Sequence, residues 1–116
     1  MKKLAVGIVA SLVFLGLAFA AQKGSTFTGE ISDLYCAKAD SHDIMMKRHD
    51  VKTVEDCVRA CVKAGGKYVL VAANDTIYVL DDQQKPVPFA RQKVKITGTL
   101  DKTTQIIHVT SIEREQ

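Results

Sequence analysis

The sequence lacks a strong charge of either sign. Its 116 residues include 16 Lys and Arg against 13 Asp and Glu, and two of the lysines, Lys2 and Lys3, stand at the start of the chain. Without these two, 14 basic residues face 13 acidic ones. The remaining Lys and Arg do not cluster in the way that phosphate-binding surfaces require. We therefore expect no nucleic-acid partner.

The sequence also lacks the standard cysteine and glycine motifs of cofactor binding and catalysis. The segment CVRAC has three residues between its cysteines and no histidine after them, which excludes covalent haem attachment and a thioredoxin-type redox site. A glycine-rich phosphate loop is missing. A cysteine enzyme would need a base beside its thiol. His42 follows Cys36 closely and could act as such a base. A third group would have to orient the histidine, and Asp33 and Asp43 are candidates only because they are near in sequence. We expect a protein without catalytic residues.

The first segment of the chain has the layout of a secretory signal peptide. Residues 1–20 start with two lysines, continue with about 16 uncharged and mostly apolar residues, and end in Ala-Phe-Ala. The apolar run is short for a membrane-spanning helix, which needs roughly 20 residues. We therefore expect cleavage after Ala20 and export to the periplasm or the cell exterior. The product, residues 21–116, would be one small domain without a stable membrane span.

Hydrophobic periodicity divides this domain into strands and helices. Period-two alternation predicts a strand over 26–35, a hairpin over 67–81 and two more strands over 93–100 and 105–113. A helix is predicted between the first strand and the hairpin, capped by Thr53 and ended by two glycines. Its apolar stripe at helical spacing consists of Val54, Cys57, Val58, Cys61 and Val62. A shorter helix, capped by Ser41, is expected before it.

These elements predict a mainly β domain with one or two helices. Gly29 and Gly98 lie inside strands, where glycine permits a sharp bend or a bulge. Five short strands in a chain of this size close economically as a small OB-like barrel, with the cysteine-bearing helix between strands one and two. That helix position departs from the usual OB arrangement, which has its helix between strands three and four. An open five-stranded sheet with a helix on one face is the alternative.

Several segments resemble a group of small exported bacterial proteins of unknown function, of the Acidobacteria type. The shared pattern reads GxIxDxxC, then SHDxMMK, then CxxxCVKxGGKYVLV, then KVxITGTL, and it covers nearly the whole domain. One departure is Arg91, which stands where the group has glycine. The resemblance implies export and a small β-rich domain, and it brings no catalytic assignment.

The three cysteines are the main functional candidates. Cys57 and Cys61 lie four apart on the predicted helix, with parallel side chains that suit a mutual disulfide poorly. Exported proteins usually pair their thiols, so we expect Cys36 to bridge to Cys57 or to Cys61. The closed loop would contribute roughly 3 kcal/mol. The domain would then be a cell-envelope binding module for an unknown small ligand or envelope protein, with one odd thiol.

The alternative is a metal-binding protein. Cys36, His42, Cys57 and Cys61 form a Cys₃His set, a ligand combination known for zinc. Met45 and Met46 could add soft thioethers, which favour Cu(I), although filling the core is the commoner role of methionine. The spacing matches no standard zinc finger. The sequence therefore leaves a disulfide and a zinc or copper site open.

Overall fold

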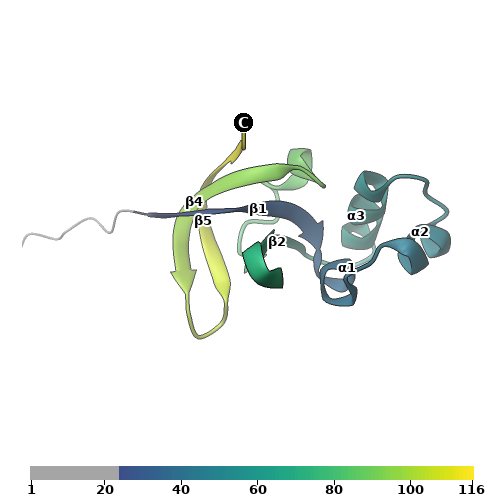
Figure 1. The fold of residues 1–116 in the computed structure, drawn as a ribbon, viewed down its shortest axis with the longest axis horizontal. Helices are drawn as coiled ribbons and strands as arrows, with labels where there is room; N and C mark the ends of the chain where they lie inside the picture. The colour runs from purple at the N-terminus through teal and green to yellow at the C-terminus, as the bar shows by residue number, and fades with distance from the viewer. Residues whose placement is uncertain (1–23) are drawn as a thin grey trace, which may run out of the picture.

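The computed structural model describes residues 24–116, so the predicted signal peptide at 1–20 lies outside the described residues. No helix within 24–116 is long and apolar enough to cross a membrane. Five strands and three short α-helices account for most of the described chain (Figure 1). The elements are β1 (Ser25–Asp33), α1 (Leu34–Ala39), α2 (Asp43–His49), α3 (Val54–Lys63), β2 (Tyr68–Ala72), β3 (Thr76–Leu80), β4 (Lys93–Asp101) and β5 (Ile106–Arg114), with 3₁₀ turns η1 (Ala73–Asp75) and η2 (Val87–Phe89).

The five strands form one sheet whose strand order, β1-β2-β3-β5-β4, closes on itself. Strand β1 makes this closure possible because it pairs antiparallel with β4 over 25–30 and with β2 over 30–33. The expected hairpin is present as β2 and β3. The β3–β5 contact is parallel and short, limited to two residue pairs. The prediction of a mainly β protein with five strands is confirmed.

Two glycines lie where strands approach each other most closely, as their positions inside strands indicate. A Cβ on Gly29 would lie 2.3 Å from Val71 O, and one on Gly98 would lie 2.1 Å from His108 O. The register between β4 and β5 shifts at Thr97/Gly98. This bulge inverts the alternation along β5, so Ile112 packs against the same core as Ile107. Strict period-two alternation over the predicted strand 105–113 would place these two isoleucines on opposite faces, and for this pair that pattern is wrong.

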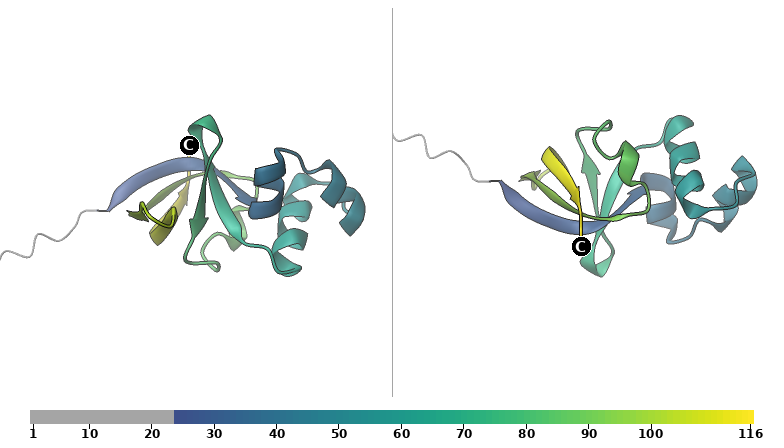
Figure 2. Two further views of the ribbon diagram at one scale, coloured as in Figure 1. Left: turned by 90° about the horizontal axis from the view of Figure 1, so that it is seen from below. Right: turned by 90° about the horizontal axis from the view of Figure 1, so that it is seen from above.

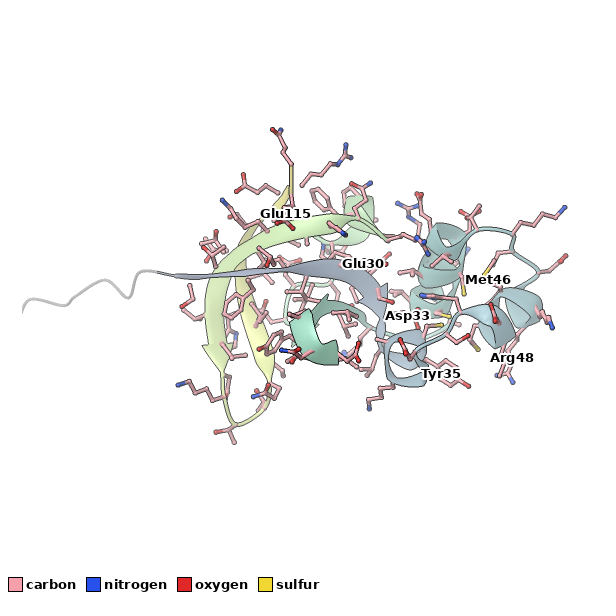
Figure 3. The ribbon with its side chains drawn as sticks, viewed as in Figure 1. Glu30, Asp33, Tyr35, Met46, Arg48 and Glu115 are labelled. Carbon is pink, nitrogen blue, oxygen red and sulfur yellow. The ribbon has the colours of Figure 1, made fainter. Side chains whose placement is uncertain are left out.

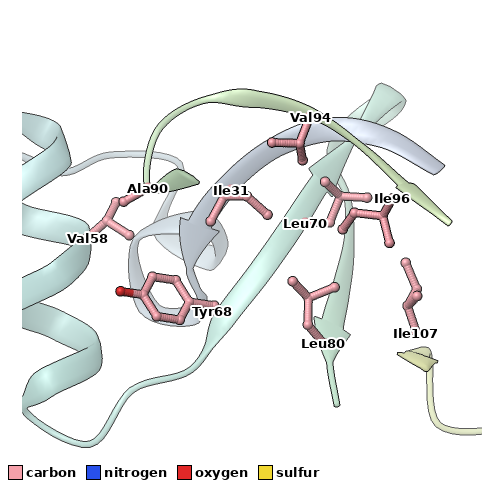
Figure 4. Packing of buried hydrophobic residues seen from close by; sticks show 9 residues of the cluster. All are labelled: Ile31, Val58, Tyr68, Leu70, Leu80, Ala90, Val94, Ile96 and Ile107. Atoms are coloured by element: carbon pink, nitrogen blue, oxygen red, sulfur yellow. The ribbon is translucent and has the colours of Figure 1, made fainter. Parts of the chain in front are cut away.

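The interior of the sheet is filled by one apolar cluster (Figure 4). Most of its members come from strands, and α3 contributes Val58, which is fully buried. This contact fixes α3 against the sheet, and Arg59 adds a hydrogen bond to Val87 O at 3.3 Å. The buried members are Ile31, Val58, Tyr68, Leu70, Leu80, Ala90, Val94, Ile96 and Ile107.

The three helices lie together at one end of the sheet, between β1 and β2 in sequence, and both views of Figure 2 show them there. Helix α3 begins as predicted, because Thr53 Oγ1 accepts a hydrogen bond from the Asp56 N–H at 3.1 Å. Helix α2 also exists, but its N-cap is His42 rather than Ser41. Helix α1 was not predicted. The first strand ends at Asp33, so Cys36 lies in a helix rather than at the end of a strand.

Candidate metal centre

Cys36 lies close to Cys57 and Cys61 where the helices meet β1, although it stands more than twenty residues before them in the sequence. Cys36 comes from α1, and Cys57 and Cys61 come from α3. All three are free thiols, and their residues are 0–5% exposed. Figure 3 shows sulfur atoms, drawn in yellow, in the region of the labels of Asp33 and Met46, where methionines also lie. The convergence that both the disulfide and the metal hypotheses require is therefore present in the described chain.

The side chains that could bind a metal form two groups that share Cys36. The Sγ atoms of Cys36 and Cys57 and a ring nitrogen of His42 all lie within 4.8 Å of one another. The Sγ atoms of Cys36 and Cys61 and a carboxylate oxygen of Asp33 satisfy the same limit. All four residues predicted as metal ligands thus belong to one cluster, and Asp33 joins them.

Local structure explains how each ligand reaches the cluster. Asp33 ends β1 and caps α1, because its Oδ2 accepts a hydrogen bond from the Cys36 N–H at 3.0 Å. On α3, the four-residue spacing places Cys57 and Cys61 on the same side of the helix. His42 precedes α2, and its carbonyl oxygen lies 3.9 Å from Cys57 Sγ, which acts as a weak donor. Every candidate ligand therefore sits on a helix or at its cap.

Methionines complete the surroundings of the thiols. Met45 is buried in the same cluster as the cysteines, and Met46 and Val51 pack against it. This is the packing role that methionine commonly has in irregular cores. Ligation by Met45 or Met46 remains a prediction, whereas their place beside the thiols is observed.

Burial and negative charge raise the pKa of two of the thiols, Cys36 and Cys61. Burial raises the pKa of Cys36 far above its usual range, and the charge of Asp33 raises it further. Burial, with contributions from Asp33 and Cys57, raises the pKa of Cys61 to about 12. A nucleophilic cysteine needs the opposite shift. A bound cation would reverse the effect by stabilising the thiolates.

Two of the cluster's polar atoms have no hydrogen-bond partner among residues 24–116. These are Asp33 Oδ1, on a residue that is fully buried, and His42 Nδ1. His49 Nε2 on α2 is the third such atom in this part of the chain. Buried polar atoms are nearly always paired, so an unpaired one needs an explanation. Two of them beside three thiols are explained together if they face an ion.

Sequence reasoning did not include Asp33 among the metal ligands. Its spacing of three residues before Cys36 fits a helix cap, and recognising that helix would have brought the carboxylate to the thiols. Its complete burial follows from packing that the sequence does not reveal. By contrast, His108 lies away from the cysteine cluster, with its Nδ1 3.1 Å from Asp81 Oδ2.

Comparison with known proteins gives one family match, and it covers most strands of the sheet but none of the proposed metal ligands. Residues 62–115, a little under half of the chain, match the model of a family described as a protein of unknown function (DUF5818). The matched segment contains β2 to β5 and begins directly after Cys61. Comparisons with curated proteins and with solved structures gave no match.

Proposed function

We propose that the protein binds a thiophilic metal ion, Zn²⁺ or Cu(I), through Cys36, His42, Cys57 and Cys61. The observation that carries this proposal is the pair of unpartnered polar atoms, His42 Nδ1 and Asp33 Oδ1, beside three buried thiols. A disulfide would use two of the sulfur atoms and leave both polar atoms unsatisfied. A cation would give the nitrogen a bond and the carboxylate a counter-charge.

The spacing of the ligand atoms allows each group of three to close on an ion after a modest contraction. Zinc binds sulfur at about 2.3 Å and nitrogen at about 2.0 Å, so the ligand atoms of a tetrahedral Cys₃His site lie about 3.5–3.8 Å apart. The atoms of each group here lie within 4.8 Å of one another. Shifts of about 1 Å in side-chain position would therefore close the group of Cys36, His42 and Cys57, and Cys61 would have to move toward them to become the fourth ligand. We expect Asp33 to balance charge beside the ion and to orient Cys36, rather than to replace one of the four ligands.

The proposal places this centre on an exported, OB-like barrel. The closed strand order and the parallel β3–β5 contact support a barrel of that kind. The predicted signal peptide at 1–20 supports export. The helices between β1 and β2 would then cover one end of the barrel and carry the metal ligands.

A disulfide-stabilised envelope-binding module is the second candidate. It is favoured by the proximity of Cys36 Sγ to the other two sulfur atoms and by the oxidising conditions outside the cytoplasm. In this case Cys36 would bridge to Cys57 or Cys61, and the domain would serve to bind another molecule.

Mass spectrometry of protein produced from the full chain, leader included, separates the two candidates. After purification under reducing, oxygen-free conditions, native spectra with Zn²⁺ or Cu(I) should show one bound ion and no alkylatable thiol. Cys36→Ser should remove the bound ion, and His42→Ala should weaken its binding. His108→Ala is the matched control and should bind normally. A second preparation, purified without reductant, tests the disulfide: a mass two daltons low, with one reactive thiol and no bound metal, would support it instead. The mass of the product also tests cleavage after Ala20.

A further inference from the structure

A groove leads from the protein surface to two of the proposed ligands. Its volume is about 890 Å³, and it runs between β1, α1 and the β2–β3 hairpin. Cys36 and His42 line it, whereas Cys57 and Cys61 do not. The groove therefore reaches the ligand cluster on the side of half-buried His42 and of Cys36, which is 1% exposed, and not on the side of α3.

The charged residues that line this groove favour a cation. Four are acidic and two are basic, which gives a net charge of −2: Glu30, Asp40, Asp75 and Glu115 against Lys38 and Lys93. Within residues 24–116, none of the four acidic side chains takes part in an ion pair. Glu30 and Glu115 are labelled in Figure 3. A net excess of one sign of charge in a cleft attracts counter-ions and speeds their association.

His42 differs from the other ligands in ways that make it the easiest to displace. It is only half-buried, whereas the three cysteines are at most 5% exposed. As the N-cap of α2 it makes no capping hydrogen bond through its side chain. Moving its ring away from an ion would therefore break one coordination bond and little else.

We infer that the groove is the route by which the proposed metal ion enters and leaves, with His42 as the ligand that an incoming donor displaces. This inference rests on the proposed metal site. In the exchange one metal–nitrogen bond breaks as one bond to the incoming donor forms, and the oxidation state of the ion does not change. The protein would then carry an exchangeable ion rather than a permanently enclosed one.

The charge part of the inference is tested by the rate at which Co²⁺ enters the metal-free full-chain protein. Thiolate-to-cobalt absorption, followed by stopped flow, reports ligation directly. The double variant Asp75→Asn/Glu115→Gln should load about 3- to 10-fold more slowly at low salt, and the difference should vanish near 1 M salt. The control Glu113→Gln/Asp82→Asn removes the same charge outside the groove and should load at the rate of the unaltered protein.

The steric part is tested by two tryptophan substitutions on α1. Ala37 lines the groove, and Ala39 on the same helix does not. Ala37→Trp should slow loading and chelator-driven release by a common factor and leave Kd unchanged, whereas Ala39→Trp should change neither rate. If Ala37→Trp does not fold, the charge variants decide alone.

Absence of Co²⁺ and Zn²⁺ binding would remove the proposed function together with this inference. Binding with equal rates in groove and control variants would overturn the inference and leave the metal site standing.

Discussion

The sheet and the helical end of the molecule are held together by different chemistry. The sheet encloses nine buried residues that are almost entirely hydrocarbon. The helical end has its own cluster, in which four buried residues, Cys36, Met45, Cys57 and Cys61, all carry sulfur. Helices α1, α2 and α3 have 6, 7 and 10 residues, and isolated helices shorter than about 12–15 residues are marginal in water. The sheet can rely on apolar burial, whereas the proposed metal bond would stabilise the helical end.

The family match follows the same division. It covers β2 to β5 and leaves out all four proposed metal ligands. The comparison with known proteins therefore bears on the sheet, and the case for metal binding rests on the helical end alone.

Truncation in the sheet core is expected to have the largest effect. Leu70 is fully buried in this core, so Leu70→Ala should lower the free energy of unfolding by about 2–5 kcal/mol in urea titrations. Both regions should unfold together, because Val58 of α3 packs into the sheet core. Helices that survive the loss of the sheet would contradict the proposed dependence of one region on the other.

Metal loading is expected to stabilise the helical end of the molecule. Zn²⁺ at a free concentration 100 times Kd should stabilise the protein by about 2.7 kcal/mol. Hydrogen exchange should slow most at the amides of α1, α2 and α3, because the ligands lie on these helices or at their caps. Cys36→Ser should abolish the effect and His108→Ala should retain it. Equal slowing in β4 and β5 would show that the two regions are not energetically distinct.

Replacing arginine by glycine should raise the stability of the protein in one region and lower it in the other. Arg91, beside the sheet, has φ of +64° and an exposed side chain, a backbone conformation that costs a non-glycine residue about 1 kcal/mol. Arg91→Gly should therefore raise the melting temperature. Arg48→Gly, at an exposed position inside α2, should lower stability by about 1 kcal/mol. Differential scanning calorimetry of the two variants measures both signs, and a lower melting temperature for Arg91→Gly would contradict the first.

The smallest expected effect on stability concerns the short contact between β3 and β5. Asp81 Oδ1 accepts a hydrogen bond from the Val109 N–H at 2.8 Å, which extends the two-pair contact between β3 and β5. Burial alone would raise the pKa of Asp81, but the hydrogen bonds from Val109 and His108 outweigh it and lower the pKa below 3.8. The carboxylate therefore stabilises the fold above pH 3.8, and this contribution disappears as the pH falls through the lowered pKa.

Asp81→Asn should accordingly cost less than about 1 kcal/mol at pH 7, because the pair is exposed. The difference from the unaltered protein should shrink toward pH 3. Urea titrations at the two pH values measure it, and a constant difference would assign the effect to packing.

Local patterns predicted most of the elements, and tertiary packing decided what they missed. The apolar stripe and the Thr53 cap predicted α3, and alternation predicted five strands, because both signals arise within a few residues. Helix α1 was missed because six residues give no helical period, and its cap Asp33 reads equally well as the end of a strand. The bulge beside Gly98 could be anticipated as a bend, but its effect on Ile112 depends on the β4–β5 register.

The candidate site was predicted by residue type rather than by geometry. Cysteine and histidine are common metal ligands. The sequence alone was therefore enough to propose Cys36, His42, Cys57 and Cys61 as one ligand set. The role of Asp33 and the groove beside His42 depend on how the helices pack against β1. These features required the structure.

The direct passage from β1 into α1 has a consequence for the evolution and engineering of this chain. No linker separates Asp33, the last residue of the strand, from the helix that carries Cys36. A single inserted residue between Ile31 and Asp33 would turn successive side chains to opposite faces and rotate Cys36 away from its partners. The length of the junction is therefore constrained as well as its side chains, and chains that share the sheet while differing in length at this point should have lost the cluster.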